Sequence, residues 1–557
     1  MAQTAAAPTE RDAASVQEAR TLVQRARLAA PILAEFSQEQ IDRIVDAVAA
    51  AARPRAEEFA KLAVEETGFG VVADKIQKNL FASERVYEFI RPMKTVGVVA
   101  HDEARKIIEI AEPFGVVAAI VPSTNPTSTA IYKILISLKA RCPVVLSPHP
   151  SAAKCITRVA ELLADAARGA GAPEGAVNWM TTVTLAGTQE LMQNRGVAVI
   201  LATGGMGLVR AAYSAGKPAY GVGPGNAPCY IERTADVAKA ANDILTGKSF
   251  DNGVLCSSPN SVVVDAAVAE EAKRQFTAQG GYFLSPAESD ALAKLLVTPQ
   301  RLPNPQLVGK SALVIAQALG ITVPANTRAL IAELTGVGRD FPLSIEKLCP
   351  VLSYYVVADW HAGCERCKEI LRYGGMGHTM SIHSENQAVI LEFGLKKPAF
   401  RICVNTPTTH GSIGLTTGLD PALTLGCGGY GGNITSDNIS PKHLLNIKRL
   451  AWELRPAPRA VAAPALPTVP KPPAPIGLDA SAMTANIESL TGARPVAAPK
   501  ADTGANQSVA TFVCEDDVRH AIKLGRTITI GDRTIVTPLA RDAGDAANVF
   551  VYANWRA

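Results

Sequence analysis

The sequence predicts an α/β protein built from parallel sheets covered by helices, followed by a flexible C-terminal extension. Three observations carry this prediction. The 557 residues exceed what one hydrophobic core holds, so two or three domains are expected. From residue 115 onward, continuous apolar runs alternate with helical segments, which is the pattern of a doubly wound parallel sheet. At residue 455 the composition changes abruptly to proline, alanine and valine, which indicates a semi-rigid spacer.

The composition excludes several classes of function. Lysine and arginine number 55 against 51 acids, and a net charge of +4 is too small to favour nucleic acid or membrane partners. No uncharged apolar run reaches the ~18 residues of a membrane-spanning helix, and the first residues lack a secretory pattern. The ten cysteines have no disulfide-framework spacing, so we expect reduced thiols in the cytoplasm. His361, Cys364 and Cys367 lie close together without a second ligand pair, so we place both thiols on a helix and expect no metal.

The N-terminal region is predicted to be helical. Between residues 13 and 67, apolar residues recur at spacings of three and four, as in amphipathic helices that cover a sheet. Two short apolar runs follow, at 96–100 and 106–110, and we interpret them as the strands of a hairpin.

Five apolar runs predict the strands of a first parallel sheet: 115–122, 144–147, 177–180, 197–205 and 219–225. Helices are expected between them, the first opened by Pro126. Ligands of such sheets bind beyond the carboxyl ends of the strands. Three turns occupy those ends: Ser123-Thr124-Asn125, Ser147-Pro148-His149-Pro150 and Thr203-Gly204-Gly205. The TGGMG segment at 203–207 either presents backbone amides to a phosphate or is a plain tight turn.

Residues 230–400 are predicted to form a second α/β region, which contains a cysteine in a turn. Cys256 lies between a helical run, 238–250, and a β-branched run, 261–265, with small and polar neighbours. A reactive thiol needs such access and such hydrogen-bonding partners. The alternative is a buried structural cysteine.

Glycine-rich segments follow at 373–383, 405–414 and 425–433, where backbone can lie close to a ligand or another chain. The segment KHLLNIKRLAW, 442–452, is predicted to be a helix.

The C-terminal extension has four predicted parts. Residues 456–477 and 493–511 are linkers rich in proline and alanine. Between them, Met483, Ile487 and Leu490 repeat at helical spacing within 478–492, which predicts either a short amphipathic helix or a disordered linker with chance spacing. The last module, 512–557, is expected to hold a helix near 516–524 and strands at 527–530, 534–537 and 550–555.

Six segments carry a resemblance to a known family: VPSTNP (121–126), GVGPGNAP (221–228), FDNGVLCSSPNSVVVD (250–265), EKLCPVLSYY (346–355), GGMGHT (374–379) and LTLGCGGYGGNITSDNISPKHLLNIKRLAW (423–452). The chain from about 13 to 455 resembles the CoA-acylating branch of the aldehyde dehydrogenases, near the propionaldehyde and acetaldehyde enzymes of bacterial microcompartments. The resemblance implies an aldehyde dehydrogenase-like fold with three parts. These are a Rossmann-type cofactor domain (1–95 and 115–229), an α/β catalytic domain (230–420) and a β oligomerisation arm (96–114 and 421–455).

The resemblance also implies roles for single residues. Cys256 is the nucleophile, and Asn125 takes the oxyanion position together with the Cys256 backbone N–H. His378 is either an acid/base group or CoA contact, or a turn histidine bonded to backbone. Glu346 holds the nicotinamide ribose. The residues expected around NAD are Pro122, Ser123, Thr124, Ser147, Pro148, His149, Thr203, Gly204, Gly205, Gly223, Gly225 and Glu346.

Two departures from the hydrolysing relatives bear on function. Val222 stands where those relatives carry the glutamate that activates water, so the acyl-enzyme is expected to wait for a better nucleophile such as CoA. Ser147 replaces a lysine that grips the adenosine ribose, which implies a looser hold on the dinucleotide.

The expected function is therefore NAD-dependent oxidation of a short-chain aldehyde, propionaldehyde before acetaldehyde, through a cysteine thiohemiacetal and thioester to acyl-CoA. Two alternatives remain: a hydrolysing dehydrogenase that releases the free acid, and a non-catalytic microcompartment scaffold. Family members imply a homodimer or homotetramer. The segment 478–492 resembles encapsulation peptides, which implies shell proteins as partners and a cytoplasmic location inside a microcompartment.

Overall fold

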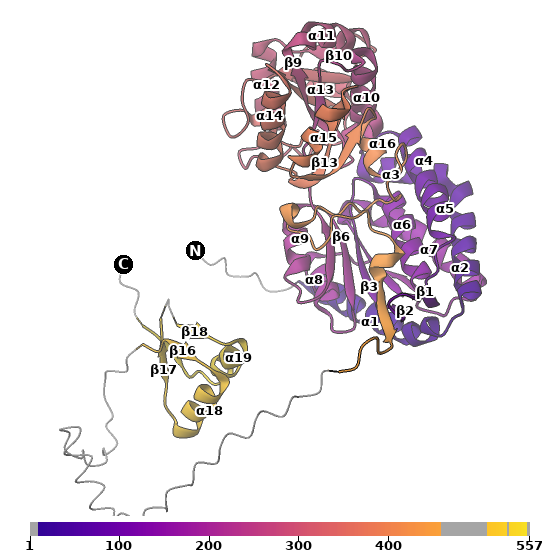
Figure 1. The fold of residues 1–557 in the computed structure, drawn as a ribbon, viewed down its shortest axis with the longest axis vertical. Coiled ribbons are helices and arrows are strands. Elements are labelled where there is room, and N and C mark those ends of the chain that lie inside the picture. Colours follow the sequence, from indigo (N-terminus) through magenta and orange to yellow (C-terminus); the bar gives the residue numbers. More distant parts are fainter. Residues whose placement is uncertain (1–8, 458–508, 532–533, 554–557) are drawn as a thin grey trace, which may run out of the picture. The chain divides into compact units, whose positions relative to one another are not determined.

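The computed structural model describes residues 9–457, 509–531 and 534–553. The chain divides into two compact units, Met1–Pro456 and Ala457–Ala557, which are treated separately below (Figure 1). The predicted helix at 478–492 lies outside the described residues, as do residues 458–477 and 493–508 of the two linkers beside it. None of the described helices is long and apolar enough to cross a membrane.

A five-stranded parallel sheet forms the centre of the first half of unit one. Its strand order is β5-β4-β3-β6-β7, and the bounds are β3 Val117–Val121, β4 Val144–Pro148, β5 Val177–Trp179, β6 Val199–Thr203 and β7 Ala219–Val222. These are the five predicted strands, and each is parallel to its neighbour. The apolar runs are continuous because both faces are covered by helices.

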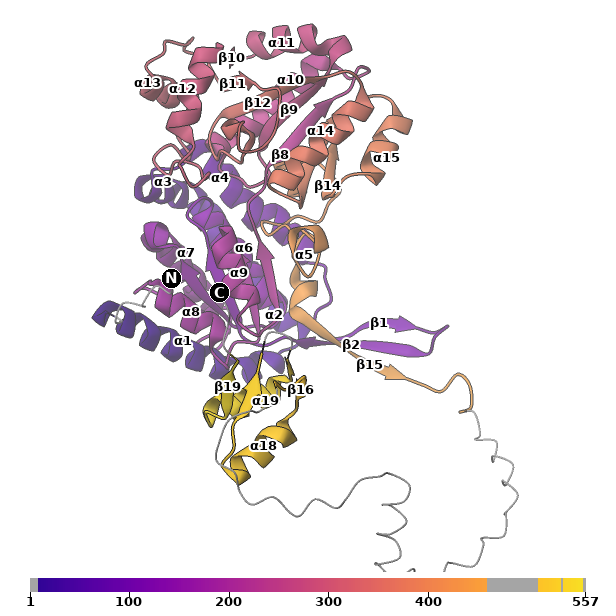
Figure 2. The ribbon, with the colours of Figure 1, turned by 90° about the vertical axis from the view of Figure 1, so that its left-hand side faces the viewer.

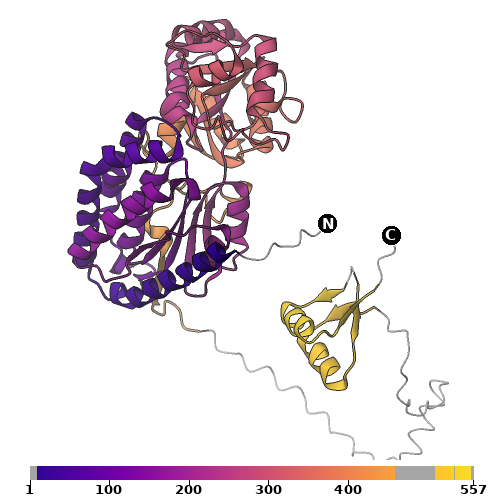
Figure 3. The same cartoon turned by 180° about the vertical axis from the view of Figure 1, so that it is seen from behind.

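Alternate residues of β3 show the two layers. Val117, Ala119 and Val121 pack into a core with α2 (Gln38–Ala52), α6 (Pro126–Lys139) and α7 (Ala153–Gly169). Ala118 and Ile120 face the opposite core with α1 (Glu10–Ala34), α8 (Leu185–Gln193) and α9 (Met206–Tyr213). Figure 3 shows the indigo helix α1 lying across that second face.

A short 3-10 helix (Arg53–Arg55) and four further helical segments follow α2. The four segments are α3 (Ala56–Thr67), α4 (Val72–Leu80), a π-helical stretch (Phe81–Val86) and α5 (Tyr87–Ile90). Helix α4 contacts both α6 and the turn at Phe250–Gly253 that precedes Cys256. The sequence predicted helices only as far as residue 67, so α4 was not anticipated.

The second half of unit one is a seven-stranded parallel sheet in the order β10-β11-β12-β9-β8-β13-β14. The strands are β8 Ala227–Ile231, β9 Pro259–Asp265, β10 Gly281–Phe283, β11 Ala329–Glu333, β12 Val351–Val357, β13 Gly377–His383 and β14 Ala399–Val404. The helices are α10 Val237–Ser249, α11 Ala269–Ala278, α12 Pro286–Leu296, α13 Ala312–Leu319, α14 Trp360–Tyr373, α15 Gln387–Leu395 and α16 Thr408–Ser412. Cys364 and Cys367 are buried on α14, as predicted.

The predicted hairpin is confirmed, but the predicted helix at 442–452 is wrong. Strand β1 (Gly97–Asp102) pairs antiparallel with β2 (Ile107–Pro113). Residues Leu445–Ala451 form strand β15, which pairs antiparallel with β2 along its whole length. Local spacing suggested a helix, but pairing with a strand more than 300 residues away decides the conformation. Figure 2 shows the three strands projecting from the rest of the unit.

The described part of unit two contains two short parallel strand pairs and two helices. Strand β16 (Phe512–Val513) pairs with β18 (Ile535–Val536), and β17 (Ile528–Ile530) pairs with β19 (Phe550–Tyr552). Helix α18 (Glu515–Leu524) matches the predicted one, whereas α19 (Pro538–Ala546) was not predicted. Thr537 caps α19 by accepting a hydrogen bond from Ala540 N–H, a signal present in the sequence.

Candidate active site

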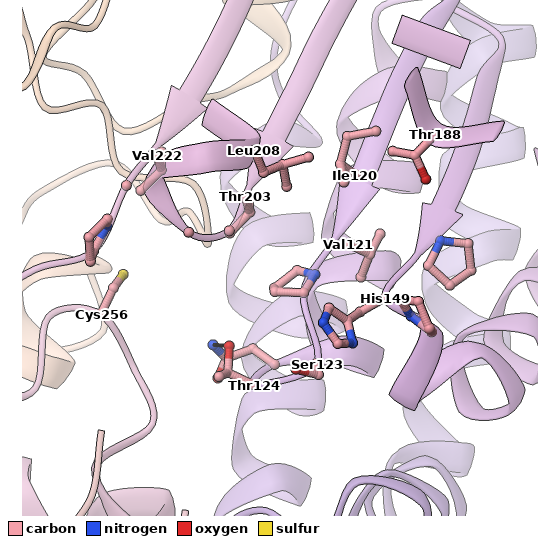
Figure 4. Close-up of a pocket in the computed structure, with 18 of the residues that line it drawn as sticks. Ile120, Val121, Ser123, Thr124, His149, Thr188, Thr203, Leu208, Val222 and Cys256 are labelled. Atoms are coloured by element: carbon pink, nitrogen blue, oxygen red, sulfur yellow. Dashed lines mark hydrogen bonds between the residues drawn. The ribbon is translucent and has the colours of Figure 1, made fainter. Parts of the chain in front are cut away.

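A cavity of about 480 Å³ lies beyond the carboxyl ends of β3, β4, β6 and β7, where the five-stranded sheet faces the Cys256 turn. This is the edge at which doubly wound sheets hold ligands. Figure 4 shows the Cys256 sulfur directed into the space bordered by Val222, Thr203 and Thr124. Twelve predicted site residues line the cavity: Pro122, Ser123, Thr124, Asn125, Pro148, His149, Thr203, Gly204, Gly205, Gly223, Cys256 and Glu346.

The nucleophile candidate is presented by a strained turn. Helix α10 ends at Ser249, and Asp251 and Asn252 then adopt left-handed backbone angles, with φ of 49° and 52°. Such angles cost non-glycine residues free energy, so surrounding contacts must hold them. Asp251 N–H donates to Asp74 Oδ2 at 2.7 Å, and the Asn252 side chain donates to Gly309 O at 2.8 Å. The turn delivers Cys256 to the cavity, where its side chain is partly exposed.

The surroundings of Cys256 favour the protonated thiol over the thiolate. Burial raises the pKa of Cys256 to about 12, and the nearby Glu346 carboxyl adds to the increase, while Arg401 acts in the opposite direction. Burial also raises the pKa of Glu346 to about 8, although the Gly225 N–H, 3.1 Å from Oε1, partly stabilises the carboxylate. A thiolate therefore needs additional positive charge or a proton acceptor at the time of reaction.

Asn125 lies at the start of α6 with its amide held at both ends. Its Nδ2 donates to Thr124 Oγ1 at 3.1 Å, and its Oδ1 accepts from Lys78 Nζ at 2.5 Å. An amide nitrogen carries two N–H donors. Within the described residues, Thr124 is the one partner of Nδ2, so the second N–H remains for a ligand in the cavity.

His378 does not line the cavity. It is fully buried on β13, and Nδ1 forms a hydrogen bond with Thr379 Oγ1 at 2.9 Å, while Nε2 has no partner among the described residues. A Cβ built on Gly225 would lie 3.4 Å from the His378 ring and 2.0 Å from the Cys256 carbonyl oxygen. Burial lowers the pKa of His378 to about 3, which favours the neutral ring. The ring lies behind the Cys256 backbone.

Comparison with known proteins identifies the family. The model of the aldehyde dehydrogenase family matches residues 3–280. The chain is 48% identical to an acetylating aldehyde dehydrogenase from Geobacillus thermoglucosidasius whose structure superposes with a TM-score of 0.79, covering 80% of this chain and 99% of that one. The chain belongs to the acylating aldehyde dehydrogenases.

Two further members of this family inform the comparison. The bifunctional aldehyde-alcohol dehydrogenase AdhE of Escherichia coli K12 is 43% identical over 442 residues, which cover 78% of this chain and 50% of AdhE. The chain thus matches about half the length of that relative. The propionaldehyde dehydrogenase of Rhodopseudomonas palustris, solved with bound CoA and an acylated cysteine, is 28% identical with a TM-score of 0.70, covering 78% of this chain and 97% of that one.

Besides His378, two of the site residues predicted from the sequence, Ser147 and Gly225, do not line this cavity. Ser147 is fully buried and bonds Thr188 Oγ1 at 2.8 Å, and it is Thr188 that lines the cavity. Gly225 lines a second cavity of about 570 Å³ on the other side of residues 223–225. The backbone of Gly225 still reaches the first cavity indirectly, because it donates to Glu346.

Several lining residues were not predicted, and they share an apolar or hydroxyl side chain: Val183, Thr184, Leu185, Thr188, Leu208, Val254 and Leu348. Leu185 is 80% exposed. The sequence marks Leu185 only by its position, as an apolar residue at the start of a helix that follows a predicted strand. Val222 lies on the cavity wall and is 2% exposed.

The cavity fits a dinucleotide of the kind that aldehyde dehydrogenases use. Its walls are largely apolar, with a few polar groups that converge on the space, which is usual for cofactor sites. Thr203 Oγ1 is buried without a partner among the described residues, so it is available to a ligand. Gly205 is the N-cap of α9 and has open space where a Cβ would lie, so a phosphate can approach the helix N-terminus.

Proposed function

We propose that this chain oxidises a short-chain aldehyde of two or three carbons to its acyl-CoA, with NAD as hydride acceptor and Cys256 as nucleophile. One observation carries the proposal: a single cavity brings together Cys256, the Asn125 amide and Val222. The first two supply covalent catalysis and oxyanion stabilisation, and the third removes the carboxylate that would activate water. The acyl group is therefore expected to transfer to a thiol rather than to water.

The chain's own residues perform the covalent steps. The Cys256 thiol loses its proton to water and the thiolate sulfur attacks the carbonyl carbon, so that an S–C bond forms and the carbonyl electron pair moves onto oxygen. The free N–H of Asn125 and the Cys256 backbone N–H donate to this oxyanion. When bound, NAD brings a cationic ring that favours the thiolate and accepts hydride from the thiohemiacetal carbon, and CoA supplies the thiol that takes the acyl group.

Three parts of the cavity wall are assigned to the cofactor. Glu346 is proposed to hold the nicotinamide ribose, and Thr203 with Gly204 and Gly205 to contact the phosphates at the start of α9. The loop at 148–150 is proposed to form the opposite wall. His378 is buried and does not line the cavity, so we propose that it supports the backbone at Gly225 and Cys256 rather than acting as an acid/base group or CoA contact.

The test of the proposal is the dependence of NADH formation on CoA. Wild-type protein with acetaldehyde or propionaldehyde and NAD is expected to form NADH steadily only when CoA is present. In Val222→Glu, a carboxylate is restored beside the acyl-enzyme, and NADH formation without CoA is expected to rise at least about tenfold, since general bases contribute 10²–10⁴-fold. Chromatography of acyl-CoA and free acid identifies the product.

Val222→Gln is the matched control, because glutamine has the size of glutamate without its basicity. It is expected to leave the CoA-free rate at the wild-type level. Rapid NADH formation by the wild type without CoA would contradict the proposal and favour the hydrolysing alternative. No turnover with any C2–C4 aldehyde would favour the scaffold.

Assembly is a second part of the proposal. We propose that the β1-β2-β15 arm pairs copies of the chain into a dimer or tetramer, because Val98, Leu450 and Trp452 on or beside it are each at least half exposed. The segment 478–492 is proposed to dock on microcompartment shell proteins through its apolar stripe.

Deletion of residues 478–492 tests the tail. The shortened protein is expected to keep its turnover and its oligomeric state, and to lose co-purification with shells. Co-purification at the full level would contradict the docking role, and a fall in turnover would mean that the segment belongs to the enzyme itself.

A further inference from the structure

A buried ion cluster lies directly behind the proposed oxyanion donor. Lys75 and Lys78 project from one face of α4, and both contact Oδ2 of Asp251, which lies in the turn that presents Cys256. The Lys75 Nζ–Oδ2 distance is 2.9 Å. Only 3%, 2% and 0% of the side chains of Lys75, Lys78 and Asp251 are exposed. Charges buried this deeply are kept only when they are paired and hydrogen-bonded.

The two lysines differ in their remaining contact. Lys78 Nζ donates to Asn125 Oδ1 at 2.5 Å, whereas Lys75 Nζ donates to the Thr124 carbonyl at 3.1 Å. Both therefore tie the loop at 123–125 to the turn before Cys256. Lys78 alone reaches the side chain of Asn125, and it does so from outside the cavity, which it does not line.

This contact determines which end of the amide faces the reacting atoms. The Asn125 side chain presents an oxygen acceptor at one end and two N–H donors at the other. A cationic amine has only donors, so it binds the oxygen and turns the nitrogen towards Thr124 Oγ1 and the cavity. Rotation by half a turn would point the carbonyl oxygen at the developing oxyanion, where it would repel the charge.

We propose that Lys78 is a positioning residue that fixes the orientation of the Asn125 amide for oxyanion stabilisation, and that Asp251 couples this orientation to the Cys256 turn. The inference rests on the proposed function, since Asn125 acts only if the reaction passes through an oxyanion. Burial lowers the pKa of Lys78 to about 8, with Asp251 opposing the decrease. Only the protonated amine is a pure donor, so the cationic form of Lys78 is the one that orients the amide.

A double-mutant cycle tests the inference. Lys78→Met is expected to lower kcat for acyl-CoA formation about tenfold, less than full removal of an oxyanion donor, and to leave KM for NAD within about twofold. In an Asn125→Ala background, the same change is expected to lower kcat by less than about twofold, because the amide that Lys78 orients is gone. Lys78→Gln keeps an N–H donor and is expected to restore part of the loss.

Lys75→Met is the matched control, because it removes the other ion pair to the same carboxylate on the same helix. Its melting temperature is expected to fall as far as that of Lys78→Met, with kcat within about twofold of wild type. If Lys78→Met does not fold, Lys78→Gln and Lys75→Gln are compared in the same two backgrounds, and only the former is expected to lower kcat.

The outcomes separate the inference from the function it rests on. A tenfold loss that persists in the Asn125→Ala background, or an equal loss in Lys75→Met, would overturn the positioning role and leave a cluster that only stabilises the fold. If the wild type is active and Lys78→Met has the same kcat as the wild type, the positioning role is also overturned. A wild type that forms no acyl-CoA at all would instead overturn the proposed function.

Discussion

Replacing Cys256 by alanine is expected to lower acyl-CoA formation by at least about 10⁴-fold, because the covalent intermediate can no longer form. No other thiol lines the described cavity; Cys427, which influences the pKa of Cys256, lines the second cavity instead. The measurements are NADH absorbance and chromatography of the acyl-CoA. NADH binding, followed by its fluorescence, is expected to stay near the wild-type level because the substituted side chain is small and partly exposed.

Cys514→Ala provides the matched control. Cys256 and Cys514 are the two partly exposed members of the ten cysteines, and Cys514 belongs to the second unit. Its replacement is expected to leave turnover unchanged. Substantial turnover by Cys256→Ala would remove this residue from the mechanism, and the thioester route would fall with it.

Asn125→Ala is expected to lower kcat by about 10²- to 10³-fold, the usual effect of removing one oxyanion donor. The loss should appear in kcat rather than in KM for NAD, since the amide acts on charge that develops during reaction. Stopped-flow measurement of the first NADH turnover isolates this step from acyl transfer to CoA.

Asn125→Asp separates the donor from the packing. The aspartate has the same shape and can still accept from Lys78 Nζ, so the fold is expected to be retained. It carries no N–H and places negative charge near the oxyanion, so its kcat is expected to be no higher than that of the alanine variant. An aspartate variant with wild-type kcat would show that Asn125 is not the donor.

The first sheet could be predicted closely because its signal is local. Strands β3, β4 and β6 are continuous apolar runs buried between two helical layers, and such runs admit few other interpretations. The error at 442–452 has the opposite cause. Strand β15 is largely exposed and alternates weakly, so its conformation depends on pairing with β2 rather than on its own residues.

The site was predicted unevenly for a related reason. Small and polar residues predict the turns at strand ends, and Ser123, Thr203 and Gly204 from these turns all line the cavity. Ser147 has the same appearance, yet its hydroxyl points to Thr188 because the direction of a side chain follows from its neighbours in space. Lys78 had no signal at all, since a lysine at the end of a helix is ordinarily solvated.

The sequence by itself determined the alternation of strands and helices along the first sheet and the position of a cysteine in a turn, because both follow from the identity and local spacing of residues. Only the tertiary structure decided that a buried lysine orients the Asn125 amide, that His378 stands behind the Cys256 backbone and that β15 completes the arm. These features depend on contacts between segments tens to hundreds of residues apart. Burial strengthens such polar contacts by removing them from water, and these residues become buried only once the chain has folded.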